Sequence, residues 1–160
     1  MASDARNKMK VYLDTHIVDA NLTDDSAVAL VNAVMYAYPP YALDLEFIAD
    51  GRTGRAPSDI IDIGFFIDKP TSKAIYDHDS TIAYYNESIP IHVHCVDRPD
   101  VTSELLLWKA ENELRTRFAA NPYASGSMWE LSETKDNTIR YGATTIFGFT
   151  IICTYLRDTT

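Results

Sequence analysis

The sequence lacks long hydrophobic runs and is short of positive charge. None of its runs approaches the ~18 apolar residues of a membrane-spanning helix, so we expect no membrane segment. Lys and Arg number 14 against 23 Asp and Glu, which leaves a formal net charge of -9 over 160 residues. Such a surface disfavours nonspecific binding along the phosphates of nucleic acid. The first residues also lack the apolar core of a signal peptide, which favours assembly in the cytoplasm.

Cysteine is nearly absent: Cys95 and Cys153 are the only two, and each lies inside an alternating apolar run. Two cysteines exclude a disulfide-rich secreted scaffold, so reduced thiols in a hydrophobic core are the simplest interpretation. Hydrophobic residues make up 46% of the chain, which is too many for a disordered tail. Since there is no repeat, linker or low-complexity stretch, residues 1–160 are expected to form a single domain.

Sequence motifs of catalysis are also missing. No serine lies in a Gly-x-Ser-x-Gly elbow, and residues 51–55 lack the length and the lysine of a phosphate-binding loop. Cys95 and His94 do not form a dyad, because adjacent strand residues face opposite sides: the thiol enters the core and the imidazole points outward. We therefore expect neither an enzyme nor a cofactor. Arg52 and Arg55 lie in a loop that is either plain surface or a contact for an acidic partner.

The order of hydrophobic periods predicts the fold. Two helical stripes open the chain, over 9–20 and 27–38, and Pro39-Pro40 ends the second. The period then changes from 3.6 to 2, and the alternation over 61–67 predicts a strand with one apolar face. A turn is expected at 69–72.

The second half of the chain adds further strands and a helix. A less regular strand around 81–86 leads into an alternating strand over 89–96, where Pro90 suggests an edge position or a bulge. The remaining predicted elements are a capped helix over 102–120 and strands near 127–134 and over 140–156. Together these elements predict an α+β fold, with a mostly antiparallel sheet of about four to five strands and helices packed on it.

His92 and His94 are two residues apart on a predicted strand, so both imidazoles face the same side. His78, in the Asp-His-Asp turn before that strand, would be the source of a third metal ligand. A His-x-His pair without a third ligand of fixed spacing is not a metal signature, so we expect no metal and assign the pair to a solvated or interface face. A small metal-dependent enzyme using these histidines is the alternative from a different functional class.

The predicted helix over 102–120 carries a narrow core stripe made of Leu107, Ala110, Leu114 and Phe118. Leu105 and Trp108 project about 100–160° away from that stripe, at 100° per residue. A Trp in this position belongs either to the rim of the core or to a subunit interface, where Trp is enriched at contact centres. The sequence leaves both interpretations open.

The segments from residue 60 to residue 157 form an ordered series. It consists of the strand Asp62-Ile63-Gly64-Phe65-Phe66-Ile67, a charged connection reaching Asp79, a long hairpin arm ending in 89–96, the acidic turn Asp97-Arg98-Pro99-Asp100, the Trp-bearing helix from Ser103, a polar segment with Asp136-Asn137, and the strand 148–155. This series resembles the tail terminator, or tail completion, proteins of long-tailed phages and related viruses. Residues 57–157 would then be the family-like core, and residues 1–22 an N-terminal helical addition.

The resemblance implies a structural protein of the virion tail or neck. Such proteins form a ring, commonly a homohexamer, that caps the tail tube, stops its polymerisation and joins the tail to the head; a head–tail adaptor is the related alternative. The implied partners are other copies of the chain, a tail tube protein, and a head-completion or neck protein. Leu105 and Trp108 would form one side of the ring contact, and either a sheet edge or the Tyr-rich arm over 76–85, with Tyr84 and Tyr85, the other. DNA would pass through the lumen without specific binding, because an acidic protein repels phosphate.

Overall fold

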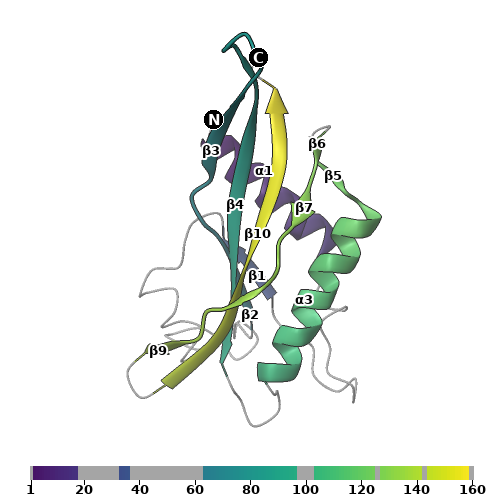
Figure 1. Ribbon diagram of the computed structural model, residues 1–160. Helices are drawn as coiled ribbons and strands as arrows, with labels where there is room; N and C mark the ends of the chain where they lie inside the picture. The colour runs from purple at the N-terminus through teal and green to yellow at the C-terminus, as the bar shows by residue number, and fades with distance from the viewer. Residues whose placement is uncertain are drawn as a thin grey trace.

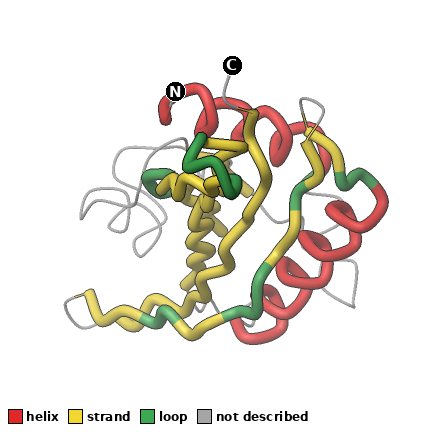
Figure 2. Tube along the Cα trace, turned by 45° about the horizontal axis from the view of Figure 1, so that its top comes forward, coloured by secondary structure: helices red, strands yellow, loops and turns green. Residues whose placement is uncertain are grey.

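The computed structural model shows two helices packed on one face of a sheet (Figure 1). The helices are α1 (Ala2–His16) and α3 (Ser103–Ala120). In Figure 2 both lie along the same side of the strands. The structure describes residues 2–17, 33–36, 63–96, 103–124, 127–141 and 144–158.

Eight strands of the described residues form one sheet, in the order β1-β2-β4-β10-β7, with β3 beside β4 and both β8 and β9 beside β10. The strands are β1 (Ala33–Tyr36), β2 (Ile63–Ile67), β3 (Thr71–Tyr76), β4 (Ile82–Val96), β7 (Glu130–Leu131), β8 (Lys135–Asp136), β9 (Ile139–Tyr141) and β10 (Thr144–Asp158). A separate ribbon pairs β5 (Tyr123–Ala124) with β6 (Ser127–Met128). Among these described strands only β1 and β2 pair in parallel, which confirms the predicted α+β class with a mostly antiparallel sheet.

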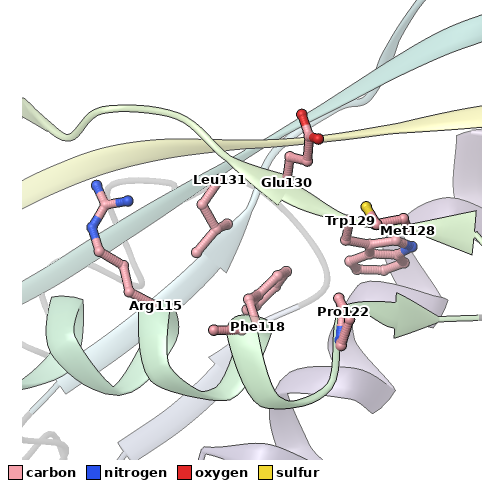
Figure 3. Close-up of a pocket in the computed structure, with 8 residues that line it drawn as sticks. Arg115, Phe118, Pro122, Met128, Trp129, Glu130 and Leu131 are labelled. Atoms are coloured by element: carbon pink, nitrogen blue, oxygen red, sulfur yellow. The ribbon is translucent and has the colours of Figure 1, made fainter.

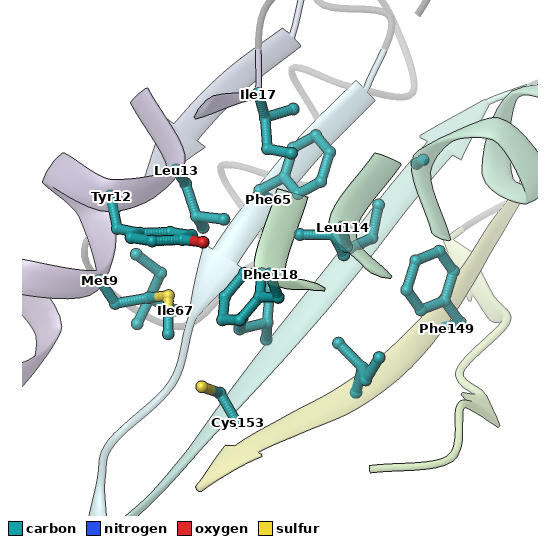
Figure 4. Packing of buried hydrophobic residues seen from close by; sticks show 14 of the residues in the cluster. Met9, Tyr12, Leu13, Ile17, Phe65, Ile67, Leu114, Phe118, Phe149 and Cys153 are labelled. Carbon is teal, nitrogen blue, oxygen red and sulfur yellow. The ribbon is translucent and has the colours of Figure 1, made fainter. Parts of the chain in front are cut away.

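β4 and β10 form the centre of the sheet and pair from Ile146 opposite Val96 to Asp158 opposite Tyr84. Every second residue of each strand faces the helices, as in the pair Ile91 and Ile151. Helices and strands meet in one buried cluster, which includes Met9, Leu13, Phe65, Leu114, Phe118 and Phe149 (Figure 4). Cys95 and Cys153 are buried free thiols of this cluster, as predicted, and burial raises the pKa of Cys153.

Tyr12 joins the two helices at the edge of the core. Its ring packs against Phe118 and Trp129, with ring centroids 4.6 and 5.4 Å away. Its hydroxyl donates to the carbonyl oxygen of Asn121 at 2.6 Å and lies 3.1 Å from that of Arg117. The Arg117 carbonyl already accepts the Asn121 backbone N–H at 2.8 Å, whereas the Asn121 carbonyl lies just past the end of α3, where the helix offers no further amide donor. The same burial raises the pKa of Tyr12 to about 12.

A three-stranded arm extends from the body of the sheet (Figure 1). We define the arm as β3, residues 82–88 of β4 and residues 154–158 of β10. β3 pairs with β4 alone among the described strands, from Thr71 opposite Ser88 to Tyr76 opposite Ile82. Within the described residues, the other backbone edge of β3 therefore has no strand paired to it.

The tip of the arm is a turn organised by Asp77. Its carboxylate accepts the backbone N–H groups of Asp79 and Thr81, at 2.9 and 3.2 Å, so the side chain replaces missing backbone partners. Ser80 adopts a φ of 63°, a left-handed conformation that glycine tolerates better than serine. The turn at the end of the arm thus has a defined shape.

The predicted second helix over 27–38 is wrong where the structure describes it. Ala33–Tyr36 forms β1, which pairs in parallel with β2, Ala33 opposite Ile63. The residue types of this segment occur in strands as well as in helices, and pairing with the edge of β2 favours the strand. The rest of that predicted helix lies outside the described residues.

Two other predictions are corrected in the arm region. The turn expected at 69–72 ends earlier, because Thr71 already begins β3. Pro90 lies inside β4, which pairs on both sides, and so is at neither an edge nor a bulge. Its carbonyl accepts the N–H of Asp68, so its ring nitrogen faces the gap between β2 and β3, where no ladder donor is needed. The single strand predicted near 127–134 is also interrupted, because β6 and β7 are two short segments.

Candidate subunit interface

α3 has one buried and one exposed face. Its inward residues Leu106, Ala110, Leu114 and Phe118 are all buried, which confirms most of the predicted stripe, with Leu107 partly buried beside them. Trp108 points away from this stripe and is 60% exposed. The structure therefore excludes the core for Trp108 and leaves the predicted interface role possible. The side chain of Leu105 lies outside the described residues.

The exposed face of α3 is held by ion pairs along the helix. Arg115 lies 3.4 Å from Glu111, and Arg117 lies 3.2 Å from Glu113, each four residues apart in the favourable order. At 100° per residue, Trp108, Arg115 and Ala119 fall within about 40° of one another. They form one stripe that runs from the exposed Trp to the C-terminal end of α3.

That stripe ends at a groove of about 420 Å³ between α3 and the segment from β6 to β7 (Figure 3). Its lining is mostly apolar and consists of Phe118, Ala119, Pro122, Met128, Trp129 and Leu131, with Arg115 and Glu130 as its charged members. Met128 is 49% exposed. The indole N–H of Trp129 is buried and has no acceptor among the described residues. No motif in the sequence indicates this groove, because its walls come from a helix and a strand that meet only in the fold.

The most exposed apolar side chains of the arm are not those of Tyr84 and Tyr85. Tyr84 and Tyr85, the predicted contact residues, are only half-exposed. Tyr85 is covered by the guanidinium of Arg157, whose Cζ lies 4.4 Å from the ring centroid. The larger exposed surfaces belong to Tyr76, at 61%, and Leu156, at 55%. Tyr76 is the last residue of β3, directly before the turn at the tip.

A buried carboxylate secures the arm. Glu87 is only 5% exposed and accepts hydrogen bonds from the Ser72 hydroxyl and from Arg157 Nε, both at 2.5 Å. The hydrogen bond to Glu87 raises the pKa of Arg157. Ser72, Glu87 and Arg157 come from β3, β4 and β10, so this cluster ties together all three strands of the arm.

His92 lies in a hydrogen-bonded chain on the face opposite the helices. Its Nε2 is 2.8 Å from Asp68 Oδ2 and its Nδ1 is 2.7 Å from Thr150 Oγ1, which also accepts Asn137 Nδ2 at 3.0 Å. Burial alone would raise the pKa of Asp68, but the hydrogen bonds from His92 and from the Lys69 amide outweigh it and lower the pKa. Both ring nitrogens of His92 are thus already engaged.

The three candidate metal ligands do not come together. His78 lies in the turn at the tip of the arm, and about 33 Å of strand, at ~3.3 Å per residue, separates Ile82 from His92. In the part of the chain that the structure describes, no three His, Cys, Asp or Glu side chains are grouped so as to hold a metal ion. The geometry therefore gives no metal centre built from His78, His92 and His94.

His94 is fully buried, which corrects the prediction that its imidazole points outward to solvent or a partner. The predicted alternation is correct, because Cys95 lies on the face of β4 that packs on the helices and His94 lies on the opposite face. At His94 that opposite face is buried as well, and the centroid of the Phe66 ring lies 5.8 Å from that of the imidazole. Burial, with a smaller effect of His92, lowers the pKa of His94 to about 4. Neither ring nitrogen has a partner within the described residues.

A cross-strand glycine makes room for this imidazole. Gly64 on β2 and Gly148 on β10 are the cross-strand neighbours of His94. A Cβ at position 148 would lie 2.4 Å from His94 Nδ1 and 2.7 Å from the Val93 carbonyl oxygen. Gly148 is therefore required by a close approach, and the sequence could show this only after the strand register was known.

The predicted contact residues Arg52 and Arg55 lie outside the described residues. Neither the comparison with protein-family models nor that with curated proteins finds a match for the chain. Among the helices that the structure describes, none is both long and apolar enough to cross a bilayer. What the protein does must therefore be inferred from its own residues and geometry.

Proposed function

We propose that the chain is a structural assembly protein that forms a ring and acts as a viral tail terminator, which caps the tail tube, stops its polymerisation and joins the tail to the neck. The observation that carries the proposal is the 60% exposure of Trp108 on a helix whose opposite face is core. An indole so exposed is costly in water and is typical of a contact centre.

The second support is that the chain presents two unlike surfaces. A closed ring needs heterologous contacts, in which each subunit offers one patch to one neighbour and a different patch to the other. The exposed face of α3 with Trp108 is one such patch. The arm, with exposed Tyr76 and Leu156 and an edge of β3 to which no described strand pairs, is the other. The same two elements would be used by a head–tail adaptor, the related neck protein.

Charge is the third support. A ring around a DNA passage must not bind the DNA, and a chain with a net charge of -9 repels phosphate. We therefore expect no DNA binding at physiological salt and assembly partners that are proteins of the tail tube and neck. The finished protein would reside in the virion.

The alternative of a small metal-dependent enzyme using His92 and His94 draws little support from the described residues. His92 is engaged by Asp68 and Thr150, and His94 is buried. Zinc binding that persists after His92→Ala combined with His94→Ala would remove this alternative. Loss of stoichiometric zinc binding in that double variant would favour it over the ring.

Sedimentation velocity combined with negative-stain imaging tests the ring. The wild type should form closed rings, alone or with the tail tube protein of the same virus. Trp108→Ala should weaken assembly about 30-fold, the equivalent of a contact residue worth about 2 kcal/mol. Its unfolding free energy should stay within about 0.5 kcal/mol of the wild type, because the removed side chain is mostly in water.

Val11→Ala is the matched control, because Val11 is 64% exposed and lies on α1, so it belongs to neither of the two patches. It should assemble like the wild type. A wild-type protein that remains monomeric at all concentrations, with no ring in the presence of tube protein, would contradict the proposal. Equal losses of assembly and monomer stability in Trp108→Ala would show that the indole is structural.

A further inference from the structure

The groove at the end of α3 and the tip of the arm offer features that can pair: an apolar hollow with an arginine, and an exposed ring beside a carboxylate. The groove has apolar walls, including Phe118, Met128 and Leu131, and its two charged members are Arg115 and Glu130. Its volume of about 420 Å³ falls in the range of ≈ 300–1,000 Å³ that holds a ligand of drug size, and so it accommodates a large side chain. Arg115 is 40% exposed at its side chain, although it also donates to the Ser132 carbonyl at 3.0 Å.

The tip of the arm offers the matching features within four residues. Tyr76 is 61% exposed, and it is followed by Asp77 and by Asp79, which is exposed at the turn. The side chain of Asp77 holds the turn together, so the acidic group left to face a partner is chiefly Asp79. An aromatic ring beside a carboxylate is thus presented on a rigid turn at the end of a projecting arm.

We propose that the groove receives the arm tip of a second copy of this chain, with Tyr76 entering between α3 and the β6–β7 segment and Asp79 facing Arg115. This inference rests on the proposed ring and names the two surfaces that form its repeated contact. The groove continues the stripe of Trp108 along α3, so one interface would bury both. In a ring this contact is heterologous, because each subunit places its arm tip in the groove of one neighbour and receives the arm tip of the other.

A stable interface sets the area that this contact has to bury. A specific interface buries about 800 Å² per partner, or about a tenth of a small protein's surface. The chain exposes 8909 Å², so the tip, the adjoining arm and the α3 stripe need to supply roughly that fraction. Large apolar side chains in pockets carry most of the energy of such contacts.

Disulfide trapping between subunits tests the placement. His78→Cys puts a thiol at the tip without touching Tyr76, and Ala119→Cys puts one on the groove wall. The native Cys95 and Cys153 are buried and do not compete. Mixing the two single variants under mild oxidation should give a cross-linked dimer in high yield. A mixture of Val11→Cys with Ala119→Cys is the matched control and should give at least tenfold less.

Charge reversal supplies a second readout. Asp79→Arg and Arg115→Asp should each weaken ring assembly at least tenfold, and their combination in one chain should restore it. Tyr76→Ala should weaken assembly similarly, whereas Tyr76→Phe, which keeps the ring, should not. Asp79→Arg, Tyr76→Ala and Tyr76→Phe change exposed residues, so their thermal unfolding should match the wild type. Arg115→Asp also loses the ion pair with Glu111 and the hydrogen bond to Ser132, so its unfolding free energy is measured beside its assembly, and the rescue in the charge-swapped chain is the decisive readout.

The outcomes separate this inference from the proposed function. The tip-in-groove contact would be overturned if the wild type forms rings but the 78–119 cross-link does not exceed the control. It would also be overturned if the charge-swapped chain does not restore assembly. The proposed ring itself would remain supported in both cases. A wild type that never assembles would overturn both. Cross-linking only to an added tail tube protein would also overturn the inference, because the groove would then serve a different partner.

Discussion

Gly148→Ala should destabilise the fold strongly, because the added Cβ has no space. It would lie 2.4 Å from His94 Nδ1, 2.8 Å from His94 Cε1 and 2.7 Å from the carbonyl oxygen of Val93. Overpacking usually costs about 1–3 kcal/mol, and one of these contacts is to backbone, which cannot rotate away. We therefore expect a loss of about 3 kcal/mol in the free energy of unfolding. Urea denaturation followed by far-UV circular dichroism measures it.

A double-mutant cycle with His94→Ala shows whether the stated contact is the cause. Two of the three short distances involve the imidazole, so removing it should relieve part of the clash, with a coupling of about 1–2 kcal/mol. The contact with the Val93 carbonyl remains, so the double variant should not recover fully. A Gly148→Ala protein within about 0.5 kcal/mol of the wild type, or strict additivity, would refute this reasoning.

Three further predictions concern buried polar groups. Lowering the pH from 6.5 to 4 should reduce the unfolding free energy by up to about 3 kcal/mol, because His94 binds a proton in the unfolded chain (ordinary pKa 6.5) but not in the fold, where its pKa is about 4. Urea denaturation at several pH values measures this dependence, and His94→Ala should remove most of it. Tyr12→Phe should lower the unfolding free energy by about 1 kcal/mol in thermal unfolding, since the Asn121 carbonyl just past α3 loses the hydroxyl donor at 2.6 Å. Arg157→Ala should lower the unfolding free energy by about 3 kcal/mol and speed proteolysis of the arm, because it leaves the buried Glu87 carboxylate without its charged partner. Glu87→Ala should have a smaller effect on both.

The sequence predicts those elements whose periodicity is strong and local. α1 and α3 were expected because their apolar positions recur at helical spacing, and those positions are buried in the structure. The alternation in β2, β4 and β10 correctly assigned Cys95 and Cys153 to the core face. These patterns reflect burial against one partner layer, so a single sequence is enough to read them.

Pairings that depend on distant partners were missed. β1 is four residues long and forms only against β2, so its local pattern fits a helix as well as a strand. β3 begins Thr71-Ser72-Lys73 and is largely exposed, so it shows no apolar alternation from which a strand could be predicted. The sequence therefore does not predict the arm as a three-stranded unit, because β3 is identified only through its pairing with β4.

The candidate interface was only partly predictable. Trp108 was selected from its helical angle, but the choice between core rim and surface needed its measured exposure. Tyr84 and Tyr85 were selected by composition, whereas the exposed aromatic of the arm is Tyr76. His94 was expected to point outward, and the space for its buried ring depends on Gly148, a cross-strand neighbour that only the strand register identifies.

The measurement that tests the ring most directly is the mass of the assembled wild-type protein beside that of Trp108→Ala in native mass spectrometry. The account predicts a species of six 18.0 kDa chains for the wild type, and its loss to monomers in Trp108→Ala at the same concentration. Val11→Ala should keep the wild-type distribution. Monomer alone in the wild type, with and without tube protein, or an unchanged assembly in Trp108→Ala, would contradict it.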